Sequence, residues 1–216
     1  MRGFLIFICL KTILFASIIE SIDVCIIRIS FSEDSISSTT GDGQFLLTNE
    51  GIDCGEYVID PPPHDFNYFL SQLKSVNTYF QTVSYGKFGI DIENSDIYPF
   101  SRNGSYQLLE NMNFYNPYNE FSLQEKRITE LFKDAVEKSY HDDQIQFSNY
   151  DLVVVFHAGI GQDFSLPFLD PTPEDIPSTY IDQDMMQEHL GESFITVGNQ
   201  IVHKGIILPE TQNHLL

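Results

Sequence analysis

The chain has 216 residues, of which 42% are apolar and 13% aromatic, enough for one domain with a substantial core. Its 31 acidic and 11 basic residues give a formal charge of -20, which would repel a nucleic-acid backbone or an anionic membrane surface. We therefore expect no nucleic-acid partner. The excess of acid is typical of soluble, exported, salt-adapted or cation-binding proteins.

The N-terminal residues 1–21 resemble a secretory signal peptide. Arg2 precedes an apolar run, and the small residues Ala16 and Ser17 follow it. Lys11 interrupts the run, which is shorter than the roughly 20 apolar residues that span a bilayer, although an uncleaved anchor remains an alternative. We expect a secreted or periplasmic protein whose domain occupies residues 22–216.

The cysteines leave two alternatives open. Removal of the leader leaves Cys25 and Cys54, which could pair in an oxidising compartment. Cys25 lies in an apolar run, so a buried free thiol is the second interpretation.

The first half of the chain predicts a strand, a helix and further strands. The β-branched run at 23–31 indicates a strand covered on both faces. A helix capped by His64 or Asp65 should follow, because apolar residues recur there at helical spacing. Its predicted buried face consists of Phe66, Phe69, Leu70, Leu73, Val76 and Phe80. Alternation at 88–92 predicts a half-buried strand, and 105–109 a second one after a hairpin tip at Asn103-Gly104.

The second half predicts one more helix and a central strand. Ser122 and Glu125 form a capping box, so a helix should begin at Ser122 and end near 141–143. The apolar run at 152–156 predicts a central strand, with short strands at 179–181 and within 194–208. We therefore expect an α/β protein with a mixed, twisted sheet and two main helices.

His157, Gly159 and Gly161 follow the central strand and are candidates for the rim of a cleft, because ligands gather at strand carboxyl ends in open α/β sheets. A histidine that only bonds nearby backbone is the preferred interpretation. The glycines do not form a nucleotide site, because the sixth position of the fingerprint is Phe164 and prolines follow it. We expect them to permit a tight turn or a positive φ angle.

The loop at 163–184 is rich in acid and proline. Asp170, Glu174 and Asp175 are weak candidates for calcium ligands, since calcium takes six to eight oxygens. The EF-hand pattern is absent from the sequence, and a solvated acidic loop is the commoner explanation.

The sequence contains no complete catalytic constellation. His-Glu-x-x-His and Gly-x-Ser-x-Gly are both absent, and His189, His203 and His214 lie too far apart to share a zinc on one helical face.

Three segments nevertheless resemble the immune inhibitor A type of secreted bacterial metallopeptidase. They are SYGKFGIDIE at 84–93, YDLVVVFHAGIGQD at 150–163 and IVHKGIILPETQN at 201–213. The loop SLPFLDPTPEDIPSTYI at 165–181 is similar to a divergent branch of that group.

The resemblance implies a zincin plan. A mixed sheet with helices comes first, followed by a helix that carries His-Glu-x-x-His, and a sheet strand beside the cleft can bind a peptide by β-augmentation. It implies that the neighbourhood of 157–163 or 201–208 lies near that cleft. We expect the chain to be the N-terminal, incomplete part of such a protein.

The complete protein would bind zinc and hydrolyse protein or peptide substrates, whereas these residues alone would bind none. A non-enzymatic extracellular module that binds calcium or a protein is the alternative.

Overall fold

The central sheet of the computed structural model has the strand order β4-β2-β6-β10-β7, with β5 also paired to β2. The structure describes residues 20–48, 60–118, 120–162 and 170–212. All pairs in this sheet are parallel except β10 with β7, which is antiparallel. The strands are β2 (Val24–Ser30), β4 (Asp96–Tyr98), β5 (Tyr106–Gln107), β6 (Leu152–Gly161), β7 (Thr179–Ile181) and β10 (Gly205–Gln212). The expectation of an α/β protein with a mixed sheet is confirmed.

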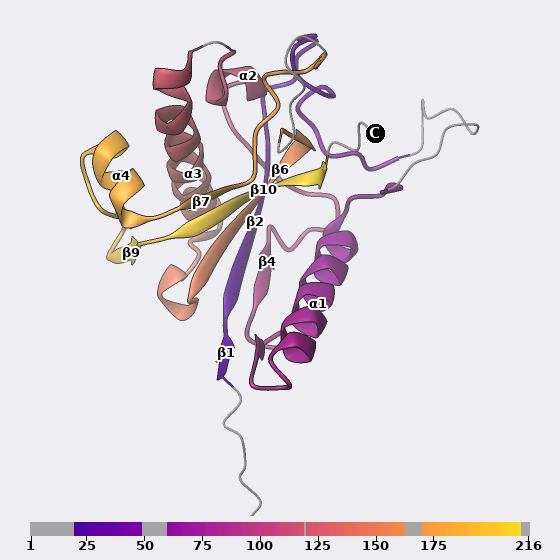
Figure 1. Cartoon of the computed structure of the whole chain (residues 1–216), viewed down its shortest axis with the longest axis vertical. Coiled ribbons are helices and arrows are strands. Elements are labelled where there is room, and N and C mark those ends of the chain that lie inside the picture. The colour runs from indigo at the N-terminus through magenta and orange to yellow at the C-terminus, as the bar shows by residue number, and fades with distance from the viewer. Residues whose placement is uncertain (1–19, 49–59, 119, 163–169, 213–216) are drawn as a thin grey trace, which may run out of the picture.

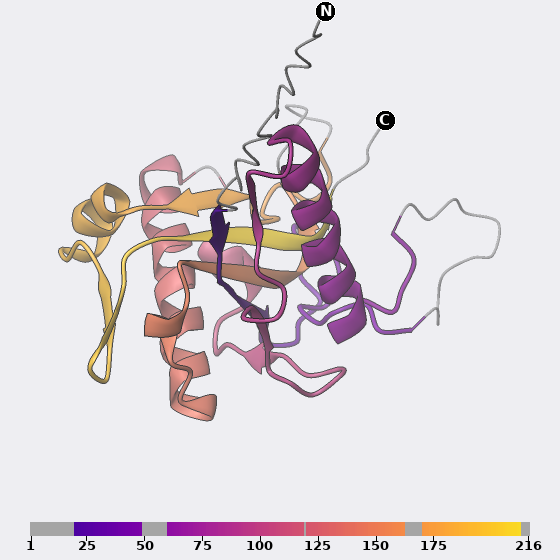
Figure 2. The ribbon, with the colours of Figure 1, turned by 90° about the horizontal axis from the view of Figure 1, so that it is seen from below.

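Two long helices, α1 (Phe66–Val83) and α3 (Phe121–Asp143), cover opposite faces of this sheet (Figures 1 and 2). Alternate residues of β2 enter different cores: Cys25 and Ile27 pack with α3, whereas Ile26 packs with α1. The crossover through α1 leads from β2 to β4, and the one through α3 leads back past β2 to β6. Right-handed crossovers in opposite directions place their helices on opposite faces.

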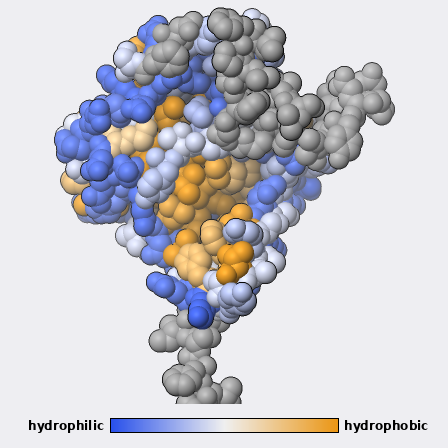
Figure 3. All heavy atoms as spheres, in the orientation of Figure 1, coloured by the Kyte–Doolittle hydropathy of each residue, from blue (hydrophilic) through white to orange (hydrophobic). Residues whose placement is uncertain are grey.

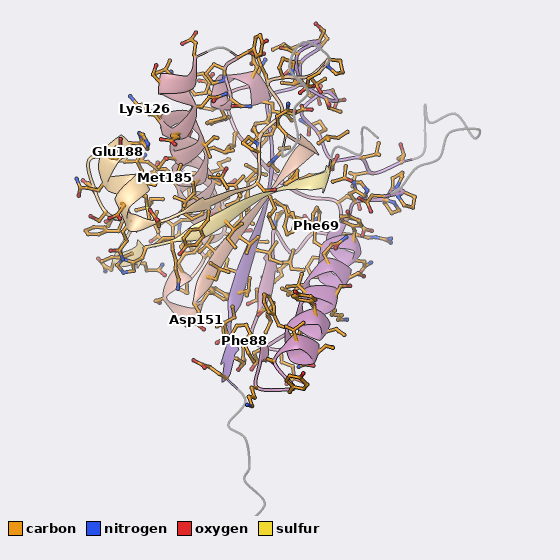
Figure 4. The ribbon with its side chains drawn as sticks, in the orientation of Figure 1. Phe69, Phe88, Lys126, Asp151, Met185 and Glu188 are labelled. Carbon is orange, nitrogen blue, oxygen red and sulfur yellow. The ribbon has the colours of Figure 1, made fainter. Side chains whose placement is uncertain are left out.

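Helix α1 begins where the sequence predicted. The Asp65 side chain accepts hydrogen bonds from the backbone N–H groups of Asn67 (2.9 Å) and Tyr68 (3.2 Å), as an N-cap residue does. Phe69, labelled in Figure 4, is fully buried. Its ring centroid lies 4.7 Å from that of Phe156 in β6. Burial of one such ring contributes about 1.5–3 kcal/mol.

The predicted start of α3 is wrong. The helix begins at Phe121 with Glu120 as N-cap, and no side chain caps it, so Ser122 lies inside the first turn instead of before it. The predicted end is confirmed, because Gln144 adopts a left-handed conformation (φ 52°) directly after Asp143.

The hairpin expected at Asn103-Gly104 is also wrong. Strands β4 and β5, which flank that turn, pair with β2 in parallel and not with each other. The buried Arg28 of β2 holds the turn by donating to the carbonyls of Pro99 (2.5 Å), Ser101 (2.7 Å) and Arg102 (3.0 Å). Burial lowers the pKa of Arg28 to about 10, so the guanidinium stays charged at neutral pH.

Several small elements complete the described chain. Strand β1 (Glu20–Ile22) pairs in parallel with β3 (Phe88–Ile90), and α4 packs beside α3 (Figure 1). The remaining elements are α2 (Met112–Tyr115), a 3₁₀ turn (Phe147–Asn149), α4 (Gln183–Leu190), β8 (Ile195–Val197) and β9 (Gln200–Val202). The sequence analysis did not predict α2, α4 or β1.

Cys25 is a buried free thiol, which agrees with the second alternative for the cysteines. Burial raises the pKa of this thiol far above its usual value, so it is not a reactive thiolate. Cys54 and residues 1–19 of the predicted leader lie outside the described residues, whereas the last two leader residues, Glu20 and Ser21, lie in β1. Within the described ranges, no helix has the length and apolar character needed to cross a membrane.

Candidate functional site

The expectation that His157, Gly159 and Gly161 follow the central strand is wrong, because β6 continues to Gly161 and contains all three. His157 is buried in β6, pairs with Ile29 of β2 and Pro209 of β10, and faces the side of the sheet that α3 covers. Its Nδ1 lies 2.8 Å from the Ala158 carbonyl oxygen, and its ring centroid lies 6.0 Å from that of Phe31. A carbonyl can only accept, so Nδ1 carries the hydrogen. A ring in this position supports the strand and would reach a ligand only after local opening.

Gly159 allows the same strand to pass close to α2. It has a φ of +96°, and a Cβ there would lie 2.3 Å from Met112 Cε and 3.3 Å from the Thr40 carbonyl oxygen. Gly161 is the buried last residue of β6. Gly159 therefore has the positive φ that was one of the two expectations for these glycines, but it lies within a strand and not in a tight turn.

The three calcium candidates are held by hydrogen bonds from neighbouring segments. The Asp170 side chain accepts from the Thr172 N–H (3.0 Å) and from Gln162. Glu174 accepts from the Tyr118 N–H (2.9 Å) and from the Ser38 hydroxyl.

Asp175 is fully buried and receives both the N–H and the hydroxyl of Thr40, each at 2.6 Å. Burial raises the pKa of Asp175, although the Thr40 donors oppose this effect. Asn116 donates to the Asp175 backbone carbonyl (2.7 Å). These groups fasten the acidic loop to the segment after β2.

No cluster of three or more metal-ligating side chains occurs in the described part of the chain. The hydrogen bonds of Glu174 and Asp175 tie the described part of the acidic loop to neighbouring segments, and residues 163–169 lie outside the described ranges.

One face of the sheet is only half covered. A row of residues crosses the sheet on the α1 side from β4 to β7: Ile97, Ile26, Val154, Ile206 and Tyr180. Exposure is 2% for Ile97 and Ile26 and 7% for Val154, whereas Ile206 is partly exposed and Tyr180 is 53% exposed. In this row the described residues cover β4, β2 and β6 but leave Ile206 of β10 and Tyr180 of β7 partly open.

Helix α1 borders this region with apolar side chains. Tyr68 faces β10, because its hydroxyl donates to the Glu210 carbonyl (2.9 Å). Val76, Tyr79 and Val83 project within about 80° of Tyr68 around the helix, since each residue advances about 100°. They are 43%, 63% and 52% exposed.

We call this region the open face. Figure 3 shows it as an apolar area in the middle of the view. It comprises Val76, Tyr79 and Val83 of α1, Phe156 of β6, Ile206 and Leu208 of β10, and Tyr180 of β7.

Strand β7 bounds the open face and ends the sheet. Its inner edge pairs with β10 through Ile181, Tyr180 and Thr179. Among the described residues no strand pairs with its outer edge. An edge strand offers N–H and C=O groups to which another extended chain can add.

A separate groove of about 510 Å³ lies beside α3, lined by Leu109, Glu110, Tyr115, Asp134 and Lys138 among others. The Tyr115 hydroxyl donates to Asp134 (2.8 Å), and burial raises the pKa of that carboxyl. The groove lies on the α3 side, so it is distinct from the open face.

No protein-family model matches the chain, and no curated protein matches it either.

The sequence contained one signal of the open face. Val76 fits the apolar face predicted for α1, and yet it is nearly half exposed. A helix position that is apolar by pattern and exposed in the fold indicates a surface that another element can cover.

Proposed function

We propose that this chain is the sheet-forming N-terminal scaffold of an exported zinc-metallopeptidase-like protein of the immune inhibitor A type. The mixed sheet with long helices on both faces is compatible with the plan that the resemblance implies. In this proposal, the helix with His-Glu-x-x-His comes from polypeptide outside these 216 residues.

The open face is the main observation that supports the proposal. Two strands span about 10 Å, since neighbouring strands lie about 4.8 Å apart, and a packed helix needs about the same width. A helix on β10 and β7 would therefore contact the sheet below it and the Val76–Val83 side of α1 beside it. Apolar surface of this kind is stabilised by about 25 cal/mol for each Å² removed from water.

The outer edge of β7 fits an extended protein or peptide substrate. A peptide that paired with this strand would lie along the border of the open face, beside the helix that we place there. The substrate would then be bound by main-chain hydrogen bonds, while side-chain pockets would determine specificity.

Zinc does not fit the described residues, since they contain no suitable ligand group and the sequence lacks His-Glu-x-x-His. We therefore assign no chemical step to these residues. Their contribution is the sheet, its edge and the surface on which a further helix packs.

Two measurements test the proposal. The full transcript should encode His-Glu-x-x-His in frame after codon 216, and the purified 216-residue chain should neither retain stoichiometric zinc nor hydrolyse casein. Tight one-to-one zinc held by this chain would overturn the proposal, and so would a transcript without the motif.

A non-enzymatic protein-binding module is the second candidate, because the open edge of β7 favours peptide binding without any chemistry. Alternate N–H groups of an extended peptide face the strand with which it pairs. Peptides N-methylated on one set of alternate residues should lose binding, and peptides methylated on the other set should keep it. This candidate would be favoured if the transcript lacked the zinc motif and the chain still bound such peptides.

A further inference from the structure

His64 and Glu210 form a buried pair that joins the segment before α1 to the end of β10. The two side chains are 0% and 6% exposed, and His64 Nδ1 lies 3.5 Å from Glu210 Oε2. The pair lies at the end of α1 where Tyr68 reaches the Glu210 carbonyl.

The second ring nitrogen determines which form of His64 fits this site. Nε2 lies 3.1 Å from the Asp60 carbonyl oxygen, which can only accept, so Nε2 carries a hydrogen. In a neutral ring Nδ1 would then be bare, and its lone pair would face the Glu210 carboxylate. Two acceptors face each other unfavourably in a buried site, whereas a proton on Nδ1 turns the contact into an attractive ion pair.

We propose that His64 binds one added proton on Nδ1 and that the resulting pair with Glu210 is a latch, which fastens the end of β10 in acid and loosens as the pH rises. The inference goes beyond the proposed function and does not depend on it, because every group involved lies in the described residues. Where the proposed function holds, the latch also fixes the strand that borders the open face.

Further contacts make this pair a junction of three segments. The Leu46 N–H donates to Glu210 Oε2 (3.2 Å), and the His64 N–H donates to the Leu46 carbonyl (2.8 Å). Thr211 donates from its hydroxyl to Asp60 Oδ2 (2.5 Å). Opening of the pair would therefore release both the 46–48 segment and the end of β10.

The titratable groups around His64 are Glu210, Asp60, Tyr68 and the Asp65–Arg102 ion pair. The Tyr68 ring stacks on His64 with centroids 4.3 Å apart, and burial together with Asp60 raises the pKa of Tyr68 to about 12. Asp65 is also buried, and Arg102 with two backbone N–H groups holds its pKa below the usual value. Neither Tyr68 nor Asp65 changes charge between pH 5 and 9.

Burial acts to lower the pKa of His64, but Glu210 and Asp60 together raise it above its ordinary value. A raised pKa in the folded state means that the contribution to stability is complete below about pH 6.5, the value of an unfolded histidine. It is lost as the pH rises through the folded value. For each unit by which folding raises the pKa of His64, the latch is ten times more stable in acid than in alkali.

NMR titration of the intact chain tests the latch without any substitution. The ring signals of His64 should titrate with a midpoint above about 6.5. Hydrogen exchange at the Leu46 amide should be slower at pH 6 than at pH 8, after correction for the intrinsic pH dependence of exchange. A midpoint below the ordinary histidine value, or pH-independent protection of Leu46, would overturn the proposal.

Two variants separate the latch from general stability. Glu210→Gln keeps an acceptor for the Leu46 N–H but removes the charge, so the His64 midpoint should fall from its value in the parent chain and the pH dependence at Leu46 should weaken. His141→Gln is the matched control, because His141 contacts Asp142 at 2.9 Å but its side chain is 85% exposed. It should leave the protection of Leu46 unchanged. An unchanged His64 midpoint in Glu210→Gln would contradict the latch.

Discussion

The carboxylate of Asp175 binds the backbone N–H and the hydroxyl of Thr40 at once, at 2.6 Å each. The two residues are far apart in sequence, and the contact ties the acidic loop to the segment that follows β2. Because Asp175 is fully buried, its loss leaves two donors without a partner.

We expect Asp175→Ala to lower the free energy of unfolding by about 1–3 kcal/mol for each donor left unsatisfied. Asp175→Asn should be much milder, since its amide oxygen can still accept from the Thr40 N–H and no buried charge remains. Urea unfolding of both variants measures the difference. Equal losses would show that the charge, not the acceptor geometry, matters at this position.

Calcium should not stabilise the described fold through the acidic loop. Glu174 and Asp175 use their oxygens on Tyr118, Ser38 and Thr40, so a cation would have to displace these donors. Calcium at ten times the Kd of a site would add about 1.4 kcal/mol. Thermal melts with calcium, and with magnesium as the control, should therefore show no saturable rise. A rise that is lost in Asp170→Asn would establish calcium binding by this loop.

Two neighbouring isoleucines of β10 should respond very differently to truncation. Ile207 is fully buried against α3, so Ile207→Ala should cost about 2–5 kcal/mol. Ile206 lies on the open face, so Ile206→Ala should cost about 1 kcal/mol or less. Urea unfolding distinguishes the two variants. Equal costs would mean that something covers the open face in solution.

Periodicity predicted the main elements because their patterns are local. The apolar run of β2 and the spacing of Phe69 and Leu73 each reflect burial against one neighbouring layer. The hairpin at Asn103-Gly104 was wrong because turn residues do not determine which strand pairs with which. Helix α4 was missed, although Asp182 caps it and Gly191 ends it with a positive φ.

The long-range contacts of the fold could not be predicted from the sequence alone. His64 and Glu210 are separated by 146 positions, and no local pattern links them. The apolar run at 152–156 predicted β6 but not its length, so His157 was expected after the strand and lies inside it. Its orientation toward the α3 side depends on the alternation of the whole sheet. The open face required the fold itself, since the strand order determines that Ile206 of β10 and Tyr180 of β7 lie on the part of the sheet that α1 leaves exposed.

Gly159→Ala should be more destabilising than Gly191→Ala. Both glycines have a positive φ, +96° and +80°, so each substitution should cost about 1–2 kcal/mol of backbone strain. A Cβ at Gly191 has no neighbour within 4 Å, whereas one at Gly159 would lie 2.3 Å from Met112 Cε. The excess cost at Gly159 should shrink in the Met112→Ala background. Independent effects in that double-mutant cycle would contradict the close contact.

Asp134 should make stability depend on pH in the acid range. Burial raises the pKa of its carboxyl, with Glu137 and Glu130 acting in the same direction, while Tyr115 and Lys133 oppose them. A carboxyl with a raised folded pKa binds its proton more tightly in the native state than in the unfolded chain. Its contribution therefore disfavours folding as the pH rises above about 3.9, the unfolded value.

Asp134→Asn keeps an acceptor for the Tyr115 hydroxyl, so it should be more stable than the parent at pH 7 and lose this advantage below pH 4. Urea unfolding at both pH values measures the change, with Asp143→Asn, beside Tyr106, as the matched control. If Asp134→Asn and the parent differed in unfolding free energy by the same amount at both pH values, the Asp134 carboxyl would titrate alike in the folded and unfolded chain.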